Sequence, residues 1–232
     1  MIEEPPLLTV NNARKRPTAA QIAAFQGVPT SFVADAMGGE GALDPAIRPL
    51  GESRDIDCVA AGPALTADTG PADILGTYAA LNFLTPGDIL VSAFGGHQRC
   101  AAVGDRVMGM IRNNEAAGFV TDGPVRDYAG IVAVGLPLWC TGLNPASPFS
   151  NGPGTVGMPI HIGGRRVETG DMIVGDRDGV VVVPFARIDA VIARLEDIKK
   201  LEIALDAEVA NGRKSSDKIA ALMDAGRVRY VD

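Results

Sequence analysis

Residues 104–127 read GDRVMGMIRNNEAAGFVTDGPVRD, and this stretch decides the expected fold class. We expect a helix from about residue 104 to about residue 118, followed by a short strand at residues 119–121. Asp122-Gly123-Pro124 then breaks the strand, because this is a turn-forming sequence. A second helix is expected over residues 125–134. Helix, strand and helix in direct succession indicate an alternating α/β unit.

The same alternation continues on both sides of this stretch. The expected strands and helices nearby are strand 58–66, helix 73–84, strand 89–91 and strand 138–140. Further along, apolar segments flank Gly163-Gly164, which predicts a β-hairpin. Alternating α/β followed by antiparallel β predicts one α/β domain with more than one sheet, or with one strongly bent sheet.

Both ends of the chain add expected helices to this domain, which spans residues 1–232. Thr18 followed by Gln21 is a capping-box pattern, which predicts an N-terminal helical extension. A long helix is expected over about residues 187–211. Its apolar residues recur at steps of three and four: Ile188, Val191, Leu195, Ile198 and Leu205. A helix of this length exceeds what the domain's own core can cover, so we expect a homo-oligomer.

Composition excludes some classes of partner. The 232 residues carry a formal net charge of -7, and only 5% are aromatic, so binding to nucleic acid or to an anionic membrane is not expected. No apolar run is long enough to span a membrane. The N-terminal residues are acidic and contain proline, unlike a signal peptide. Three widely spaced cysteines, Cys58, Cys100 and Cys140, favour a reducing cytoplasm over a disulfide framework or a zinc site.

Charged and glycine residues in the opening stretch suggest a site for an acidic substrate. A helix that begins near Gly104 presents unpaired N–H groups that can receive a carboxylate, from Gly104, Asp105, Arg106 and Val107. Arg126 and Asp127 follow a strand, where ligands collect in alternating α/β folds. Asp127 can bind a hard cation through oxygen, and Arg126 can hold a carbonyl or enolate oxygen. The alternative is structural: a plain turn, a helix-start acid and a surface arginine.

Four further motifs carry a resemblance to a known family. They are ADAMG at 34–38, DPAIRPL at 44–50, PGD at 86–88 and GDRDGVVVVP at 175–184. With the 104–127 stretch, they make the chain resemble the RraA-like family from about Thr30 to Leu205. That family contains 4-hydroxy-4-methyl-2-oxoglutarate aldolases, which are often labelled dimethylmenaquinone methyltransferases. No nucleotide-binding glycine motif is present, so a methyltransferase cofactor is not expected.

The resemblance implies a fold and a set of roles. The fold would be a three-layer β/β/α swivelling domain of the phosphohistidine-like type, assembled as trimers or dimers of trimers. Asp127 would bind Mg²⁺ or Mn²⁺ directly, and Arg126 would contact the 2-oxo oxygen of a small 2-oxo acid. Asp105 would hold a metal-bound water and help move protons. Glu202, on the long C-terminal helix, would reach the site of a neighbouring subunit.

Family members cleave 4-hydroxy-2-oxo acids to pyruvate, and many decarboxylate oxaloacetate. Other relatives regulate ribonuclease E by protein binding, which is the alternative function for this chain. The sequence departs from the family at Arg106, where an apolar residue is usual, and at residues 95–99. These departures leave the substrate beyond the pyruvate half open. His97, in the second of these segments, is a further candidate for a substrate contact, whereas His161 is expected to be structural.

Overall fold

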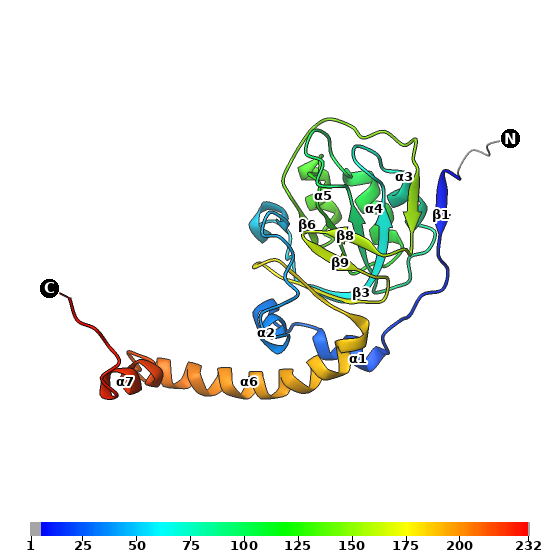
Figure 1. The fold of residues 1–232 in the computed structure, drawn as a ribbon. Helices are drawn as coiled ribbons and strands as arrows, with labels where there is room; N and C mark the ends of the chain where they lie inside the picture. The colour runs from blue at the N-terminus through cyan, green and yellow to red at the C-terminus, as the bar shows by residue number, and fades with distance from the viewer. Residues whose placement is uncertain (1–5, 232) are drawn as a thin grey trace.

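The computed structural model describes residues 6–231, and strand β3 (Ala60–Asp68) organises its architecture (Figure 1). The second half of β3 pairs in parallel with β4 (Ile89–Ala93) and antiparallel with β7 (Gly154–Val156). Its first half pairs antiparallel with β10 (Met172–Gly175), which in turn pairs with β11 (Val180–Val183). One long strand therefore belongs to two sheet regions, and the sheet is branched and bent as the sequence pattern predicted.

Four neighbouring strands run in parallel and form the centre of the sheet. They are β3, β4, β5 (Gly118–Thr121) and β6 (Leu138–Cys140). Each is buried over nearly all its residues, which explains why these segments are continuously apolar or small rather than alternating. Shorter strands occupy the edges: β1 (Leu8–Val10) beside β7, and β2 (Arg48–Pro49) beside β6. The carboxyl ends of the parallel strands meet at one edge, where ligands collect in such folds.

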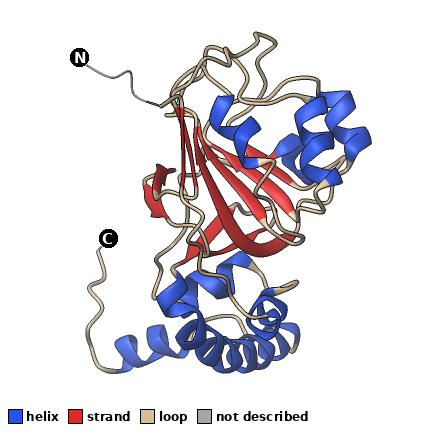
Figure 2. Cartoon of the chain, turned by 90° about the vertical axis from the view of Figure 1, so that its right-hand side faces the viewer, coloured by secondary structure: helices blue, strands red, loops and turns tan. Residues whose placement is uncertain are grey.

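The layers around this sheet form a three-layer β/β/α arrangement (Figure 2). One face is covered by helices α3 (Leu75–Ala80), α4 (Asp105–Asn113) and α5 (Tyr128–Val134). The hairpin of β8 (Ile160–Ile162) and β9 (Arg165–Val167) packs its apolar side chains into the same core from the other side. Burial of this large apolar cluster is the main contribution to the stability of the domain.

A second apolar core lies beneath β10 and β11. Helices α1 (Ala19–Phe25) and α2 (Thr30–Ala36) pack there with the start of α6 (Ile188–Ala210). The structure confirms the capping box, since the Thr18 side chain accepts from the Gln21 backbone and the Gln21 side chain accepts from the Thr18 backbone. Short 3-10 turns at Leu50–Ser53 and Phe185–Arg187 complete the regular structure. Within residues 6–231, no helix has both the length and the apolarity needed to cross a membrane.

Helix α6 leaves the body of the molecule after its first half. Only Ile188, Val191 and Leu195 are buried on it, and the rest projects outward with α7 (Asp217–Asp224) at its end (Figure 1). Apolar side chains remain exposed along this arm: Leu201, Ile203, Leu205, Val209, Ile219 and Met223. The predicted long helix is therefore present at nearly the expected bounds, and its outer half lies beyond the cover of the domain's own core.

The structure corrects three predicted helix boundaries. Helix α3 spans Leu75–Ala80 rather than residues 73–84. Helix α4 ends at Asn113 rather than near residue 118, because Glu115 takes a left-handed conformation with φ 57°. Helix α5 begins at Tyr128 rather than at Val125, because Asp127 is also left-handed, with φ 63° and ψ 48°. Strand β1 was not expected from the sequence pattern. β1 is an exposed strand of three residues, too short to show a clear pattern.

Candidate active site

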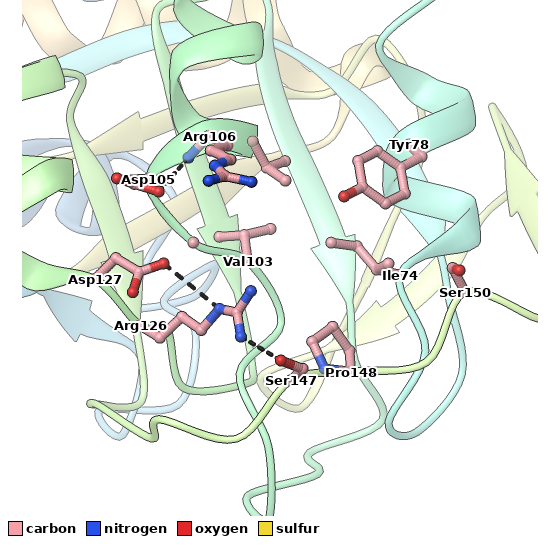
Figure 3. A pocket seen from close by; sticks show the side chains of 12 residues that line it. Ile74, Tyr78, Val103, Asp105, Arg106, Arg126, Asp127, Ser147, Pro148 and Ser150 are labelled. Atoms are coloured by element: carbon pink, nitrogen blue, oxygen red, sulfur yellow. Dashed lines mark hydrogen bonds and ion pairs between the residues drawn. The ribbon is translucent and has the colours of Figure 1, made fainter.

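A pocket of about 550 Å³ opens at the carboxyl edge of the parallel strands (Figure 3). Four parts of the chain form it: the start of α3, the start of α4, the segment leading into α5, and the loop that follows β6. Its lining residues are Ile74, Tyr78, Val103, Gly104, Asp105, Arg106, Val107, Arg126, Asp127, Ser147, Pro148 and Ser150. All six residues predicted from the 104–127 stretch therefore lie around one cavity.

Backbone pairing fixes the position of Arg126 and Asp127. Val125 forms isolated bridges with Val103 on one side and Leu143 on the other, and the Arg126 N–H donates to the Val103 carbonyl at 3.0 Å. Asp127 then turns the chain into α5 through its left-handed conformation. A left-handed non-glycine residue costs roughly 1–3 kcal/mol, and such strain concentrates at functional sites. The turn sets the Asp127 carboxylate beside the start of α4.

Gly104 permits this close approach. Its φ of -126° is accessible to any residue, so its backbone conformation does not require glycine. A Cβ added there would lie 2.5 Å from Asp127 Oδ2 and 3.2 Å from Arg126 Nε. A side chain at position 104 would therefore displace the Asp127 carboxylate and the Arg126 side chain, which share this wall of the pocket with the first turn of α4.

Asp105 is held between two helices. Its Oδ1 accepts the backbone N–H of Arg106 at 2.7 Å, and a Cβ added to Gly130 of α5 would collide with its carboxylate. Elsewhere in this first turn, the backbone N–H groups of Gly104, Asp105 and Val107 have no hydrogen-bond partner within residues 6–231. Free amides at a helix start, with the positive end of the helix dipole, can receive a carboxylate.

Arg126 has few protein partners for a guanidinium. Its Nε lies 3.5 Å from Asp127 Oδ2, and its Nη1 donates to the Ser147 hydroxyl. The Arg126 and Asp127 side chains keep 36% and 47% of their surface exposed. Figure 3 shows both beside the pocket, so their charges remain accessible to a ligand.

Asp73 fixes the loop that carries Ser147 and Pro148. Its Oδ2 accepts the backbone N–H groups of Asn151 at 2.7 Å and of Gly152 at 3.1 Å, while its Oδ1 accepts that of Leu75 at 2.8 Å. Burial raises the pKa of this carboxyl, but these backbone donors stabilise the charged form more, and the pKa lies below its ordinary value. Asp73 thus ties the pocket's outer loop to the start of α3.

The donor set around the pocket fits a hydrated divalent cation. Within residues 6–231, no group of three or more His, Cys, Asp or Glu side chains could enclose a metal. The pocket instead offers the carboxylates of Asp127 and Asp105. Mg²⁺ typically keeps several waters and binds proteins through one or two carboxylates, whereas zinc sites are usually built around His nitrogen or Cys sulfur. Asp127 is the more accessible candidate ligand, since Asp105 already accepts an amide.

Other candidate residues lie outside this pocket. Asp122 accepts the backbone N–H groups of Phe94 at 2.5 Å and Gly96 at 2.8 Å, so it holds a turn. Burial raises its pKa, against the effect of these two donors. His97 packs edge-on against the Phe94 ring. Glu202 lies on the projecting part of α6 and does not line the pocket of its own chain.

The sequence reasoning missed the wall formed by α3 and the loop after β6. Tyr78, Ser147 and Ser150 lie far from the 104–127 stretch in sequence, and the loop was expected only from its proline and glycine content. A signal was available, because the connection after β6 follows the parallel strand next to β5 and must leave the same sheet edge.

Comparison with known proteins identifies relatives of this chain. The family model described as "RraA-like: Aldolase/RraA" matches residues 30–182. A protein of Halalkalibacterium halodurans named "Putative 4-hydroxy-4-methyl-2-oxoglutarate aldolase" is 35% identical over 201 residues, which cover 87% of this chain and 91% of the relative. An Arabidopsis thaliana protein with the same name, numbered 3, is 31% identical over 61% of this chain and 82% of its own length.

A solved structure shows the same fold. Streptomyces coelicolor RraAS2, described as an unusual member of the RNase ES inhibitor RraA protein family, superposes with a TM-score of 0.73. It is 25% identical, and the match covers 83% of this chain and 100% of that one. With a family model matched over most of its length and a relative of 35% identity, the chain belongs to the RraA-like family.

Proposed function

We propose that the protein is a divalent-metal-dependent lyase that cleaves 4-hydroxy-2-oxo acids, such as 4-hydroxy-4-methyl-2-oxoglutarate, to pyruvate. The same site would decarboxylate oxaloacetate. One observation carries the proposal: Arg126, Asp127, Asp105 and the free amides of the first turn of α4 line a single pocket. The names of the bacterial and plant relatives support the aldolase reaction.

Each end of the pyruvate half has a matching group in the pocket. The C1 carboxylate docks on the free backbone N–H groups of Gly104, Asp105 and Val107. The Arg126 guanidinium donates to the 2-oxo oxygen, and this interaction strengthens as negative charge develops there. Asp127 would hold a Mg²⁺ or Mn²⁺ ion, which would supply Lewis-acid polarisation of the 2-oxo group. Ser147, which accepts from Arg126, keeps the guanidinium directed into the pocket.

Asp105 is placed to move protons. Through water, it takes the proton of the C4 hydroxyl as the C3–C4 bond breaks, and the carbonyl product forms at C4. The electron pair of that bond forms the C2=C3 double bond of an enolate, and the negative charge develops on the 2-oxo oxygen, where Arg126 stabilises it. The proton then returns to C3 and gives pyruvate. With oxaloacetate, the broken C3–C4 bond releases CO₂ and leaves the same enolate, so one arginine serves both reactions.

The exposed arm supports a further part of the proposal, that the enzyme works as a homotrimer or homohexamer. Apolar side chains along α6 and α7 remain uncovered in one chain, and a second copy would bury them. In this assembly Glu202 reaches the neighbouring pocket and orients water beside Asp105 and Asp127. A cytoplasmic location fits the three free cysteines, which are all buried.

A second function deserves a test because RraAS2 is described as a member of an RNase ES inhibitor family. In this alternative, the chain acts by binding the ribonuclease and needs no chemistry in the pocket. The two functions differ in what they require of Asp105, Arg126 and Asp127. A pure regulator would keep its binding after all three were replaced, whereas a lyase would lose its activity.

Pyruvate release tests the lyase directly. The purified chain is mixed with 4-hydroxy-4-methyl-2-oxoglutarate, other 4-hydroxy-2-oxo acids and oxaloacetate, with Mg²⁺, with Mn²⁺ and with excess chelator. Pyruvate is followed with a coupled dehydrogenase. We expect metal-dependent release from at least one hydroxy acid and from oxaloacetate. No release from the whole panel in the presence of either metal would refute the proposal.

A further inference from the structure

The turn at Asp127 is supported from outside the pocket by the residue that follows it. Tyr128 begins α5, and its hydroxyl donates to the Asp55 carboxylate, 73 positions earlier in the chain. We propose that Tyr128 and Asp55 are positioning residues, whose hydrogen bond holds Asp127 in its left-handed conformation and so sets its carboxylate for the cation. This inference rests on the proposed lyase function and deepens it by naming two further residues on which the metal site depends.

The conformation of Asp127 has no local support. An aspartate at a helix N-cap usually has an extended backbone, and its side chain accepts a backbone N–H of the first turn. Asp127 instead has φ 63° and ψ 48°, and its side chain makes no such bond. Left-handed residues other than glycine persist only where surrounding contacts hold them. The contacts that hold Asp127 must therefore act on the residues on either side of it.

Both neighbours of Asp127 are fixed by distant parts of the chain. On the N-terminal side, the Arg126 N–H donates to the Val103 carbonyl at 3.0 Å. On the C-terminal side, the Tyr128 side chain is fixed by Asp55, whose carboxylate has no other hydrogen bond or ion pair within residues 6–231. Because the φ and ψ angles of Asp127 set the direction in which the chain continues, a fixed Tyr128 side chain restricts these angles as well.

The segment that carries Asp55 forms a rigid platform. Residues 51–53 are all left-handed, with φ of 59°, 55° and 56°. Ser53 is buried, and its hydroxyl donates to the Ile56 carbonyl at 2.9 Å and accepts the Cys58 N–H at 2.8 Å. This segment is therefore held by its own hydrogen bonds, independently of Tyr128, and it can act as a fixed support.

Tyr128 lies against this platform and outside the substrate pocket. A Cβ added to Gly51 would collide with the Tyr128 hydroxyl oxygen, so a side chain at position 51 would displace the hydroxyl. Tyr128 and Asp55 line a separate cavity of about 460 Å³, and neither lines the pocket that contains Asp127. They therefore act on Asp127 through the backbone and not by contact with the substrate.

Calorimetric titration with Mg²⁺ measures the effect of this hydrogen bond on the metal site. Tyr128→Phe removes the hydroxyl and Asp55→Ala removes the acceptor, so each should weaken Mg²⁺ binding by about tenfold, as for loss of a hydrogen bond to a charged group. Asp55→Asn keeps an oxygen acceptor and should retain most of the affinity. The double variant Tyr128→Phe/Asp55→Ala should bind no more weakly than either single variant, because both substitutions remove the same bond. Wild-type affinity in Tyr128→Phe would overturn the proposal.

Two matched controls separate this bond from a general loss of charge or of a hydroxyl. Asp57→Ala removes an exposed carboxylate two residues from Asp55, and Tyr230→Phe removes the hydroxyl of a tyrosine that is 75% exposed. Both controls should bind Mg²⁺ as wild type does. Equal weakening by Asp57→Ala and Asp55→Ala would assign the effect to charge and overturn the proposal. Additive losses from Tyr128→Phe and Asp55→Ala would also overturn it, because the two residues would then act separately.

Turnover should show that the bond acts on the metal and not on the substrate. Arg126 and the free amides of α4 remain in Tyr128→Phe, so KM for the oxo acid should stay near that of wild type. Its kcat at a subsaturating Mg²⁺ concentration should fall by about tenfold and recover as Mg²⁺ is raised. A raised KM with an unchanged kcat would mean that Tyr128 supports substrate binding instead, and would contradict the proposal.

Amide hydrogen exchange tests the positioning without metal or turnover. The Ile131 N–H donates to the Asp127 carbonyl at 3.0 Å, so its protection reports on Asp127, whereas the Cys58 N–H reports on the platform. In metal-free protein, Tyr128→Phe should speed exchange at Ile131 by about fivefold or more and leave Cys58 unchanged. This result would support the positioning even if wild type bound no Mg²⁺ and released no pyruvate. Unchanged exchange at Ile131 would contradict the positioning even if the lyase were active.

Discussion

The carboxylates of Asp88 and Asp127 both lie beside arginine side chains, but they differ in burial and in the number of partners within the protein. The Asp88 side chain is fully buried, and Arg14 binds both of its oxygens, at 2.8 and 2.7 Å. Arg16 and the Thr85 backbone N–H complete its partners. Asp127 is 47% exposed and has Arg126 only at 3.5 Å. The oxygens of Asp88 are therefore fully hydrogen-bonded within the protein, whereas those of Asp127 remain largely available to a ligand.

This difference teaches how structural and functional charges can be told apart. Asp88 joins the N-terminal segment to the start of β4, so its charges stabilise the fold. In the pocket, Asp127 has a strained left-handed backbone, and its carboxylate lies close to Gly104. The charged side chains of Arg126 and Asp127 have few hydrogen-bond partners within the protein. Such groups cost stability, as is expected where a protein binds a ligand. Substitutions at the two places should therefore act on different measurements.

The largest effect on stability is expected at Asp88. Asp88→Ala leaves two arginines without their buried partner, and breaking a buried ion pair costs about 3–5 kcal/mol. The free energy of unfolding, from urea denaturation, should fall by that amount. Glu40→Ala is the matched control, because Glu40 pairs with Arg187 at an exposed site and should cost under about 1 kcal/mol. Similar losses for the two variants would remove the distinction between a saturated and an exposed pair.

Arg126 should show the opposite pattern. Arg126→Ala removes the donor to the developing enolate oxygen, which is expected to cost roughly 3–4 kcal/mol of transition-state stabilisation, while the unfolding free energy stays near that of wild type. Arg126→Lys should restore only part of the activity, because the guanidinium fork is lost. Rates of pyruvate release and urea denaturation are measured on the same samples. Near-normal turnover in the alanine variant would mean that Arg126 has no catalytic role.

A smaller effect is expected from Glu202, which extends the comparison to the arm. Glu202→Gln should lower turnover by about tenfold, as for loss of a group that orients a metal-bound water, with little change in stability. Glu196→Gln, on the same helix and exposed, is the control. Mixed oligomers of Glu202→Gln and Asp127→Asn subunits should regain some activity, because some sites would combine intact residues from two chains. A monomer at working concentration, or no recovery in verified mixed oligomers, would rule out a shared site.

The smallest effect concerns Asp73, which supports the pocket loop. Its folded-state pKa lies below the ordinary value of 3.8, so its contribution to stability is present above that value and is lost as the pH falls through the folded-state pKa. Asp73→Asn should cost about 1 kcal/mol at pH 7 and less at acid pH. Melting temperatures between pH 7 and pH 3 check this. A constant difference across that range would show that the charge of Asp73 is not involved.

The sequence was a good guide to the central α/β unit and to one side of the pocket. Short apolar strands bounded by Asp-Gly and Gly-Pro turns have few alternative structures, and residues 104 to 127 fold locally into two helix starts around one strand. The family resemblance was confirmed by the comparisons, and the roles implied for Arg126, Asp127, Asp105 and Glu202 remain predictions.

The rest of the site could not be predicted, because it depends on contacts between distant segments. Tyr78 reaches the pocket from α3, and Ser147 reaches it from a loop that Asp73 holds in place. The predicted start of α5 at Val125 was wrong, because Asp127 adopts a left-handed conformation and the helix begins only after it. Helix propensity alone does not predict a left-handed conformation at this residue. Gly130 gave no signal, since its role lies in the space that it leaves for Asp105.

Magnesium dependence through Asp127 is the most direct test of the central claim. Calorimetric titration with Mg²⁺ and pyruvate release are measured on wild type and on Asp127→Asn, after circular dichroism has shown that both are folded. We predict that wild type binds Mg²⁺, loses turnover in excess EDTA and regains it when Mg²⁺ or Mn²⁺ is restored, while Asp127→Asn binds the metal weakly and releases almost no pyruvate. Full wild-type turnover in excess EDTA, or unchanged turnover in Asp127→Asn, would contradict a metal-dependent lyase at this site.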